Sequence, residues 1–369
     1  MKVMLVFGTR PEAIKMCPLV NELKKDSRFE VKVCVTAQHR EMLDSVLEIF
    51  SVKPDYDLNI MSHGQTIVDI SSRVLTGVDK IIKQDKPDIV LVHGDTSTTL
   101  NAAMAAFYNK VLVGHIEAGL RSGDINSPYP EEFNRKLVGN FADLHFAPTK
   151  GNIENLLKEG VESKKIYLTG NTVIDALLEV IKKDYVYEDE NLNKIDFDNK
   201  KIILLTCHRR ENWGDPMENI FKAVKEVIET ESDVEVIFPM HKNPAIRELA
   251  KNIFKEDSKI HLIEPLDYEP FANLISKSYL IMTDSGGIQE EAPALGKPVL
   301  VLRTETERPE AVEAGTVKIV GVSREKIVDE TKKILNSKDE YEKMANAINP
   351  YGDGKACEKI LAILKKGIR

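Results

Sequence analysis

Short apolar runs alternate along the whole chain with longer stretches in which apolar residues recur every three or four positions. Apolar runs of about four to eight residues are typical of buried strands, and the longer spacing is typical of amphipathic helices. Their alternation predicts α/β architecture, with parallel sheets covered by helices on both faces. Strands are expected over residues 2–7, 30–36, 89–93, 111–116, 144–147, 202–206, 234–239, 260–263, 279–283, 299–302 and 317–319.

The length of the chain and one polar stretch predict two domains. A chain of 369 residues is too long for one typical core. Residues 184–200 contain few side chains of the kind usually buried, and Gly170 leads into a helix shortly before them. We therefore predict two Rossmann-like, doubly wound domains that face a cleft. They are expected over residues 1–170 and 171–350, with a C-terminal helix in 351–369.

Composition excludes several classes of protein. The formal net charge of −8 disfavours broad nucleic-acid binding. No apolar run is long enough for a membrane-spanning helix, and the first residues predict a buried strand and not a signal peptide. The four cysteines are scattered without a C-x-x-C pair, which argues against a zinc site and for a reducing cytoplasm. No metal or membrane partner is expected.

Ser285, Gly286 and Gly287 form the most informative motif. They follow the apolar strand that ends at Thr283 and open the next helix. Glycines at a helix N-terminus let backbone N–H groups approach a diphosphate closely, and the helix dipole favours negative charge there. Glu291, one turn into the helix, suits a ribose diol, and Arg308 is one of the cations that follow the next strand. The segment predicts a nucleotide-diphosphate site, although a strand-to-helix turn alone often contains a glycine.

A second anion site is predicted where the first strand ends. Arg10 precedes Pro11, which suits the first turn of a helix. Lys15 follows about one and a half turns later, where it either reaches the same anion or is solvated. This segment lacks the G-x-G-x-x-G fingerprint, so nicotinamide binding is not supported.

Three carboxylates are expected at the carboxyl edge of the first sheet. Asp95 and Glu117 each follow a predicted strand, and Glu131 follows a Pro-Tyr-Pro loop. Open α/β sheets bind ligands at this edge, and neighbouring carboxylates shift one another's pKa values as acid–base pairs require. The alternatives are that Asp95 caps a helix and that Glu131 is an ordinary first-turn acid. No cofactor is expected, because nothing in the sequence suggests a hydride carrier or a metal cluster.

Two residues of the second domain complete the candidate set. His208 follows a strand and precedes two arginines, as suits a ligand of a leaving diphosphate, although a structural histidine remains an alternative. Phe271 is a candidate for contact with a base, although such a residue more often belongs to the core.

The ordered motifs resemble the non-hydrolysing UDP-N-acetylglucosamine 2-epimerases over nearly the whole chain. The matching segments are Gly8–Glu12 with Lys15, Gln38–Arg40, Val92–Thr96, His115–Arg121, Pro130–Arg135, His208–Asn212 and Met282–Glu310.

This resemblance implies a pair of glycosyltransferase-B-like domains, a homodimer, and a C-terminal helix that packs back on the first domain. It also implies reversible conversion of UDP-N-acetylglucosamine to UDP-N-acetylmannosamine through a 2-acetamidoglucal, which supplies activated sugars for cell-surface glycans. Asp95, Glu117 and Glu131 would be the acid–base set. Arg10, Lys15 and His208 would hold the diphosphate, His208 taking part in catalysis. The residues that would contact the uracil, ribose and phosphates are Phe271, Ser285, Gly286, Gly287, Glu291 and Arg308.

In some members of the family, substrate also binds a neighbouring activating site, which Gln38, His39 and His241 resemble. Three other functions stay open: a hydrolysing epimerase that releases free N-acetylmannosamine, a retaining glycosyltransferase of the same fold, and a nucleotide-sugar sensor without turnover.

Overall fold

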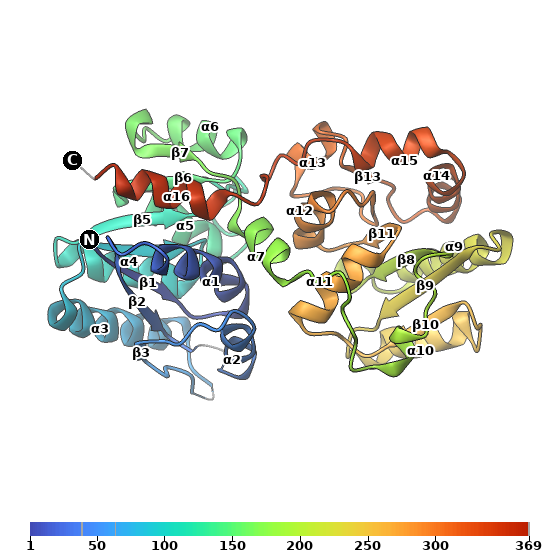
Figure 1. Ribbon diagram of the computed structural model, residues 1–369, viewed down its shortest axis with the longest axis horizontal. Helices are drawn as coiled ribbons and strands as arrows, with labels where there is room; N and C mark the ends of the chain where they lie inside the picture. The colour runs from blue at the N-terminus through green and yellow to red at the C-terminus, as the bar shows by residue number, and fades with distance from the viewer. Residues whose placement is uncertain (38–39, 63, 368–369) are drawn as a thin grey trace. The chain divides into compact units, whose positions relative to one another are not determined.

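The computed structural model describes residues 1–37, 40–62 and 64–367. Within them the chain forms two units, residues 1–179 with 351–369 and residues 180–350. Each unit contains one parallel sheet (Figure 1). The eleven predicted strands are all present with ends shifted by at most one residue, which confirms the α/β class.

The first unit contains a seven-stranded sheet with the order β3-β2-β1-β4-β5-β6-β7. Its strands are β1 (Lys2–Phe7), β2 (Glu30–Val35), β3 (Tyr56–Asp57), β4 (Ile89–His93), β5 (Leu112–Ile116), β6 (Leu144–Ala147) and β7 (Ile166–Leu168). Its helices are α1 (Arg10–Lys24), α2 (Arg40–Ile49), α3 (Ile67–Asp85), α4 (Ser97–Tyr108), α5 (Glu131–Phe141), α6 (Lys150–Lys158), α7 (Thr172–Val180) and α16 (Ala356–Lys365). The short strands β3 and β7 lie at the sheet edges and were not predicted.

The second unit contains a six-stranded sheet with the order β10-β9-β8-β11-β12-β13. Its strands are β8 (Lys201–Thr206), β9 (Val234–Pro239), β10 (Ile260–Ile263), β11 (Leu280–Thr283), β12 (Val299–Val301) and β13 (Val317–Ile319). Its helices are α8 (Glu190–Asn193), α9 (Asp215–Thr230), α10 (Pro244–Phe254), α11 (Tyr268–Lys277), α12 (Gly286–Ala294), α13 (Pro309–Glu313), α14 (Arg324–Asn336) and α15 (Lys338–Ala345).

Strand order positions the candidate residues in both units. In the first sheet the order reverses between β1 and β4, and in the second between β8 and β11. The helices that follow the two strands of such a pair leave on opposite faces, which opens a crevice at the carboxyl ends of the strands. The loops after these four strands are therefore where a ligand is expected.

The last helix belongs to the first unit. After Pro350 the chain returns, and α16 packs beside α1, as the red and blue helices in Figure 1 show. Asp175 accepts backbone N–H groups of Ala356 and Cys357 at 3.1 and 2.9 Å, which fixes the start of α16. Ile360 on the packed face is fully buried.

Replacing Ile360 by Ala should destabilise the first unit by about 2–5 kcal/mol, the range for deleting a fully buried branched side chain. Chemical denaturation would measure this loss. Glu358→Ala, an exposed position on the same helix, is the control and should change the midpoint little. Equal effects of the two variants would show that α16 is not held by its packed face.

Candidate active site

A buried carboxylate, Glu12, organises the crevice of the first unit. Its Oε2 accepts the N–H groups of Gly8 and Thr9 at 3.0 and 2.8 Å, and its Oε1 accepts the hydroxyl of Thr96 at 2.8 Å. Burial raises the pKa of Glu12, and the hydroxyls of Thr96 and Thr9 oppose that change. Glu12 therefore joins the loop after β1 to the loop after β4. Glu12 is not among the predicted site residues, although Thr-x-x-Glu at a helix start is a recognisable capping box.

Glu117 lies at the same edge of the sheet, directly after β5. Its backbone has a φ of 60°, which is uncommon for a residue other than glycine. Its Oε1 contacts Lys15 Nζ and accepts the side-chain amide of Asn171 at 3.0 Å. His93 Nε2 lies 3.7 Å from its Oε2. The predicted contact between Lys15 and a diphosphate stays a prediction.

Asp95 follows β4, and its side chain is 26% exposed. Burial and then the charge of Glu117 raise the pKa of Asp95 to about 6, and Arg135 and Lys15 oppose the shift. Arg135 Nη1 donates to Asp95 Oδ2 at 3.2 Å. The helix cap that we considered for Asp95 is provided instead by Thr96.

Glu131 is the first residue of α5 and is half-buried. Its negative charge also raises the pKa of Asp95, so the two groups are near each other. The structure therefore brings Asp95, Glu117 and Glu131 to one edge of one sheet. Arg10, at the start of α1, is half-buried beside the same crevice.

Buried histidines lie beneath these carboxylates. Burial lowers the pKa of His93 to about 4 and that of His115 to about 3. Both rings are therefore neutral at physiological pH. His115 Nε2 lies 2.7 Å from the carbonyl oxygen of Gly94, a contact that holds the loop before Asp95.

In the second unit, the buried carboxylate of Asp284 accepts backbone N–H groups of a loop at the sheet edge, as Glu12 does in the first unit. Its Oδ2 accepts the N–H groups of His208 and Arg209 at 2.9 and 2.8 Å, and its Oδ1 lies 3.2 Å from His208 Nδ1. Burial alone would raise the pKa of Asp284, but these contacts lower it below its usual value. Asp284 thus orients the His208 ring. Asp284 is not among the predicted site residues, although like Asp95 it follows a strand at the carboxyl edge of its sheet.

Two arginines and Glu307 lie near the N-terminus of α12, which begins after Ser285. A Cβ atom placed on Gly286 would lie 3.8 Å from Glu307 Oε2, 3.9 Å from Arg209 Nη2 and 3.9 Å from Arg308 Cζ, whereas one on Gly287 would meet nothing within 4 Å. Arg308 pairs with the buried carboxylate of Glu290. This open, positively charged helix N-terminus suits an anionic ligand.

Three predicted residues lie around this crevice or near it, and two lie outside the described residues. Glu291 is half-buried on α12, and Phe271 is half-buried on α11. The His241 ring stacks on the His208 ring with a centroid distance of 6.0 Å. Gln38 and His39 lie outside the described residues, so their predicted roles stay predictions.

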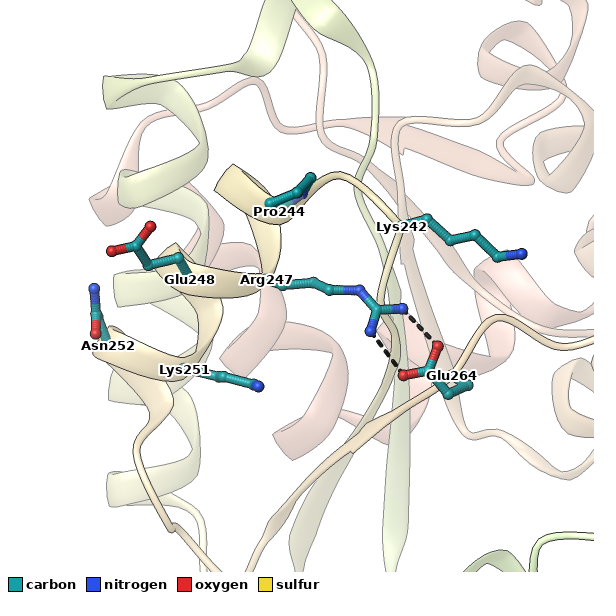
Figure 2. A pocket seen from close by; sticks show the side chains of 7 residues that line it. All are labelled: Lys242, Pro244, Arg247, Glu248, Lys251, Asn252 and Glu264. Atoms are coloured by element: carbon teal, nitrogen blue, oxygen red, sulfur yellow. Dashed lines mark hydrogen bonds and ion pairs between the residues drawn. The ribbon is translucent and has the colours of Figure 1, made fainter.

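A separate open pocket lies on α10 beside the end of β10 (Figure 2). Arg247 Nη1 and Nη2 bind both oxygens of Glu264 across it, at 2.7 and 2.6 Å. Its lining residues are Lys242, Pro244, Arg247, Glu248, Lys251, Asn252 and Glu264. Because its arginine is already paired within the pocket, we assign no ligand to it.

The family model described as UDP-N-acetylglucosamine 2-epimerase matches residues 21–365. The chain belongs to the UDP-N-acetylglucosamine 2-epimerase family. It is 54% identical over 373 residues to the UDP-N-acetylglucosamine 2-epimerase of Escherichia coli K12, covering 99% of this chain and 98% of the relative. It is 55% identical over 361 residues to that of Bacillus subtilis 168, covering 98% and 94%. A solved structure of UDP-GlcNAc 2-epimerase from Neisseria meningitidis bound to UDP-GlcNAc is 49% identical, with a TM-score of 0.86 over 100% of both chains.

No helix in residues 1–37, 40–62 and 64–367 is long and apolar enough to cross a membrane. In the same ranges, no group of three or more histidine, cysteine, aspartate or glutamate side chains is arranged to hold a metal ion.

In this epimerase-family chain, replacing Asp95 by Asn should stabilise the fold at neutral pH but not at about pH 4. An unfolded aspartate loses its proton near pH ~3.9, whereas the raised pKa of Asp95 is about 6. Between these values the folded chain holds a proton that the unfolded chain has lost, so stability falls as pH rises. The free energy of unfolding of the variant should therefore exceed that of the wild type by an amount that grows up to about pH 6 and then stays constant. Denaturation at a series of pH values would measure this difference.

Glu132→Gln is the control with the opposite sign. Burial alone would raise the pKa of Glu132, but the Ser122 N–H and Arg135 lower it. A carboxylate with a lowered pKa contributes stability above its unfolded pKa and loses it as pH falls through the folded value. The loss of stability of this variant relative to the wild type should therefore become smaller towards acid pH. A stability difference for Asp95→Asn that does not vary with pH would contradict the assignment.

Proposed function

We propose that the protein catalyses the reversible interconversion of UDP-N-acetylglucosamine and UDP-N-acetylmannosamine at C2 of the sugar. The observation that carries this proposal is the gathering of Asp95, Glu117 and Glu131 at one sheet edge, in a chain of this family. The names of the relatives and the UDP-GlcNAc in the solved structure of one of them support the choice of substrate.

The reaction proceeds by elimination and re-addition. One carboxylate takes the C2 proton, the C2–H electron pair forms the C1–C2 double bond, and the C1–O pair leaves with UDP. UDP then returns to C1 of the 2-acetamidoglucal while an acid delivers a proton to the other face of C2. This route avoids a full carbanion at a weakly acidic carbon. It needs acid and base groups that differ in pKa, as the raised value of Asp95 provides.

The leaving group needs positive charge that persists through the whole cycle. Ser285, Gly286 and Gly287 hold the diphosphate, and Arg308 lies beside them. His208, oriented by Asp284, stabilises the departing UDP together with Arg10 and Lys15. Glu291 takes the ribose diol and Phe271 flanks the uracil.

The proposed route consumes no cofactor, because elimination and re-addition leave the oxidation state of the substrate unchanged. We place the reaction in a reducing cytoplasm, which the four free, buried cysteines support. The product would supply N-acetylmannosamine sugars for cell-surface polysaccharides. Gln38, His39 and His241 are proposed to form a neighbouring site at which substrate activates the enzyme.

Incubation with UDP-N-acetylglucosamine in D₂O should give UDP-N-acetylmannosamine with deuterium at C2. Proton NMR would measure the formation of this product and the loss of the C2 proton signal. Asp95→Asn, Glu117→Gln and Glu131→Gln should each lower turnover by ~10²–10⁴-fold, the usual contribution of an acid or base group. UDP binding, measured by calorimetry, should persist in all three, since the diphosphate is held by other groups.

Other products would contradict the proposal in distinct ways. Free N-acetylmannosamine as the main product would identify a hydrolysing epimerase, and sugar transfer to an acceptor would identify a glycosyltransferase. Binding without turnover, unchanged by Asp95→Asn, would identify a sensor. Near-normal turnover in all three variants would remove the carboxylates from the chemistry.

We also propose that the protein is a homodimer joined through α4 and α5. These helices pack together in the first unit and leave a group of exposed apolar side chains. They are Phe107, Tyr108, Phe133 and Leu137. The Phe107 ring packs on Phe141 with a centroid distance of 5.4 Å, which joins the two helices into one apolar surface. Contiguous exposed apolar surface of this kind marks protein interfaces.

Leu137→Glu should convert the dimer to a monomer, because a carboxylate would be buried without a partner at the interface. Light scattering coupled to size exclusion measures the mass directly. Leu157→Glu makes the same change at an exposed leucine of α6 and should leave the dimer intact. A wild-type protein that is monomeric at micromolar concentration would overturn this proposal.

A further inference from the structure

Asn171 lies where the two passages of the chain between the units come together. The chain leaves the first unit after Glu179 and returns to it at Tyr351. The backbone N–H of Asn171, just before α7, donates to the carbonyl oxygen of Tyr351 at 2.7 Å. The outgoing and returning segments are thus joined within the first unit.

Two glycines allow this close approach. Gly170 has a φ of 88°, and a Cβ atom there would lie 3.1 Å from the Tyr351 oxygen and 3.2 Å from Gly352 Cα. Gly352 itself has a φ of 125°. A side chain at Gly170 would push the segments apart and adopt a strained backbone conformation.

The side chain of Asn171 is held at both ends. The residue is 3% exposed, and its Oδ1 accepts the N–H of Val173 at 3.1 Å. Because Asn171 Oδ1 faces the start of α7, the Nδ2 group of the same amide points to Glu117. Nδ2 donates to Glu117 Oε1 at 3.0 Å. An asparagine amide has both an acceptor and donors, so it can make these two contacts at once.

The charged and titratable groups around Glu117 come from several elements. Lys15 from α1 contacts the same oxygen as Asn171, and His93 from β4 lies 3.7 Å from the other. Asp95, after β4, is close enough for the charge of Glu117 to raise its pKa. Lys15 favours the carboxylate through its charge, whereas Asn171 adds a directed donor without charge. A carboxylate that accepts such a donor is held both in place and in its ionised form.

We infer that Asn171 is a positioning residue that holds Glu117 for proton transfer and joins it, through Tyr351, to the returning C-terminal segment. The inference rests on the proposed function for its catalytic consequence, but not for its contacts. It adds to the acid–base set a residue that does not itself touch the substrate.

Asn171→Asp is the sharpest test. The change is nearly isosteric and keeps the acceptor for Val173, but it places a second carboxylate oxygen where a donor faced Glu117. Two carboxylates at this separation share a proton, which raises one pKa. We expect kcat at neutral pH to fall ~10–10²-fold, with KM for UDP-N-acetylglucosamine within about twofold. The acidic limb of the kcat–pH profile should move upward by about one pH unit or more, so that activity partly returns at alkaline pH.

Asn171→Ser provides a second variant if the aspartate variant folds poorly. Serine also suits the start of a helix, but its side chain is too short to reach Glu117. It should lower kcat at an unchanged KM and an unchanged melting temperature. Asn152→Asp is the matched control, because Asn152 is a buried asparagine of the same unit whose Oδ1 accepts backbone and hydroxyl donors of Thr149. That control should keep the wild-type kcat and pH profile.

The inference would be overturned if Asn171→Asp and Asn171→Ser kept the wild-type kcat and pH profile. It would also be overturned if kcat fell only in proportion to the fraction of each variant that is unfolded. If the wild-type protein shows no epimerisation, the proposed function fails but the inference can still be tested. The ¹³C titration of the Glu117 carboxyl, assigned with Glu117→Gln, should then move to higher pH in Asn171→Ser. An unmoved titration would reject the positioning role independently of turnover.

Discussion

A buried carboxylate that accepts backbone N–H groups at the crevice of each parallel sheet is the interaction on which the loops of both crevices depend. Glu12 in the first unit accepts the N–H groups of Gly8 and Thr9, and Asp284 in the second accepts those of His208 and Arg209. Strand order opens each crevice, but it leaves the loop backbones there without partners from the sheet. Each carboxylate satisfies these donors from inside the protein, so the outer surface of the loops remains available to a ligand. Hydrogen bonds outweigh the cost of burying the charge in Asp284, whose pKa is lowered, and offset it only in part in Glu12, whose pKa is raised.

The two crevices differ in the charge of the side chains around them. Around the first crevice, the charges of Glu117 and Glu131 are close enough to raise the pKa of Asp95, and Arg135 and Lys15 oppose that shift. Around the second, two arginines and Glu307 lie near an open helix N-terminus. Proton transfer needs groups that hold and release protons near neutral pH, whereas a diphosphate needs fixed positive charge. The difference in charge between the two crevices follows from which side chains occupy otherwise similar loops.

Much of the fold was predictable because buried parallel strands are continuous apolar runs. β3 and β7 were missed, since Tyr56–Asp57 and Ile166–Leu168 are short edge strands that lack a fully buried run. The stretch 184–200 was expected to contribute little to a core, yet Tyr187 and Leu192 are buried in it. Asp95 and Glu117 could be placed at one sheet edge because each follows a strand, and the carboxyl ends of parallel strands share one edge. The supporting contacts were not predictable, because Asn171 and Glu117 are distant in sequence and neither local segment indicates the other.

The conformation of Glu117 shows why such support is needed. A glutamate at a φ of 60° directly after β5 is strained, and such strain persists only where neighbouring structure determines the conformation. Lys15 contributes charge from α1, and Asn171 contributes a directed donor from the segment that pairs with Tyr351. Without Asn171, the Glu117 carboxylate could rotate while it kept its contact with Lys15, because an ammonium group has no preferred plane. The amide, fixed by Val173 at its other end, removes that freedom, so the geometry of Glu117 depends on a contact made by the last nineteen residues of the chain.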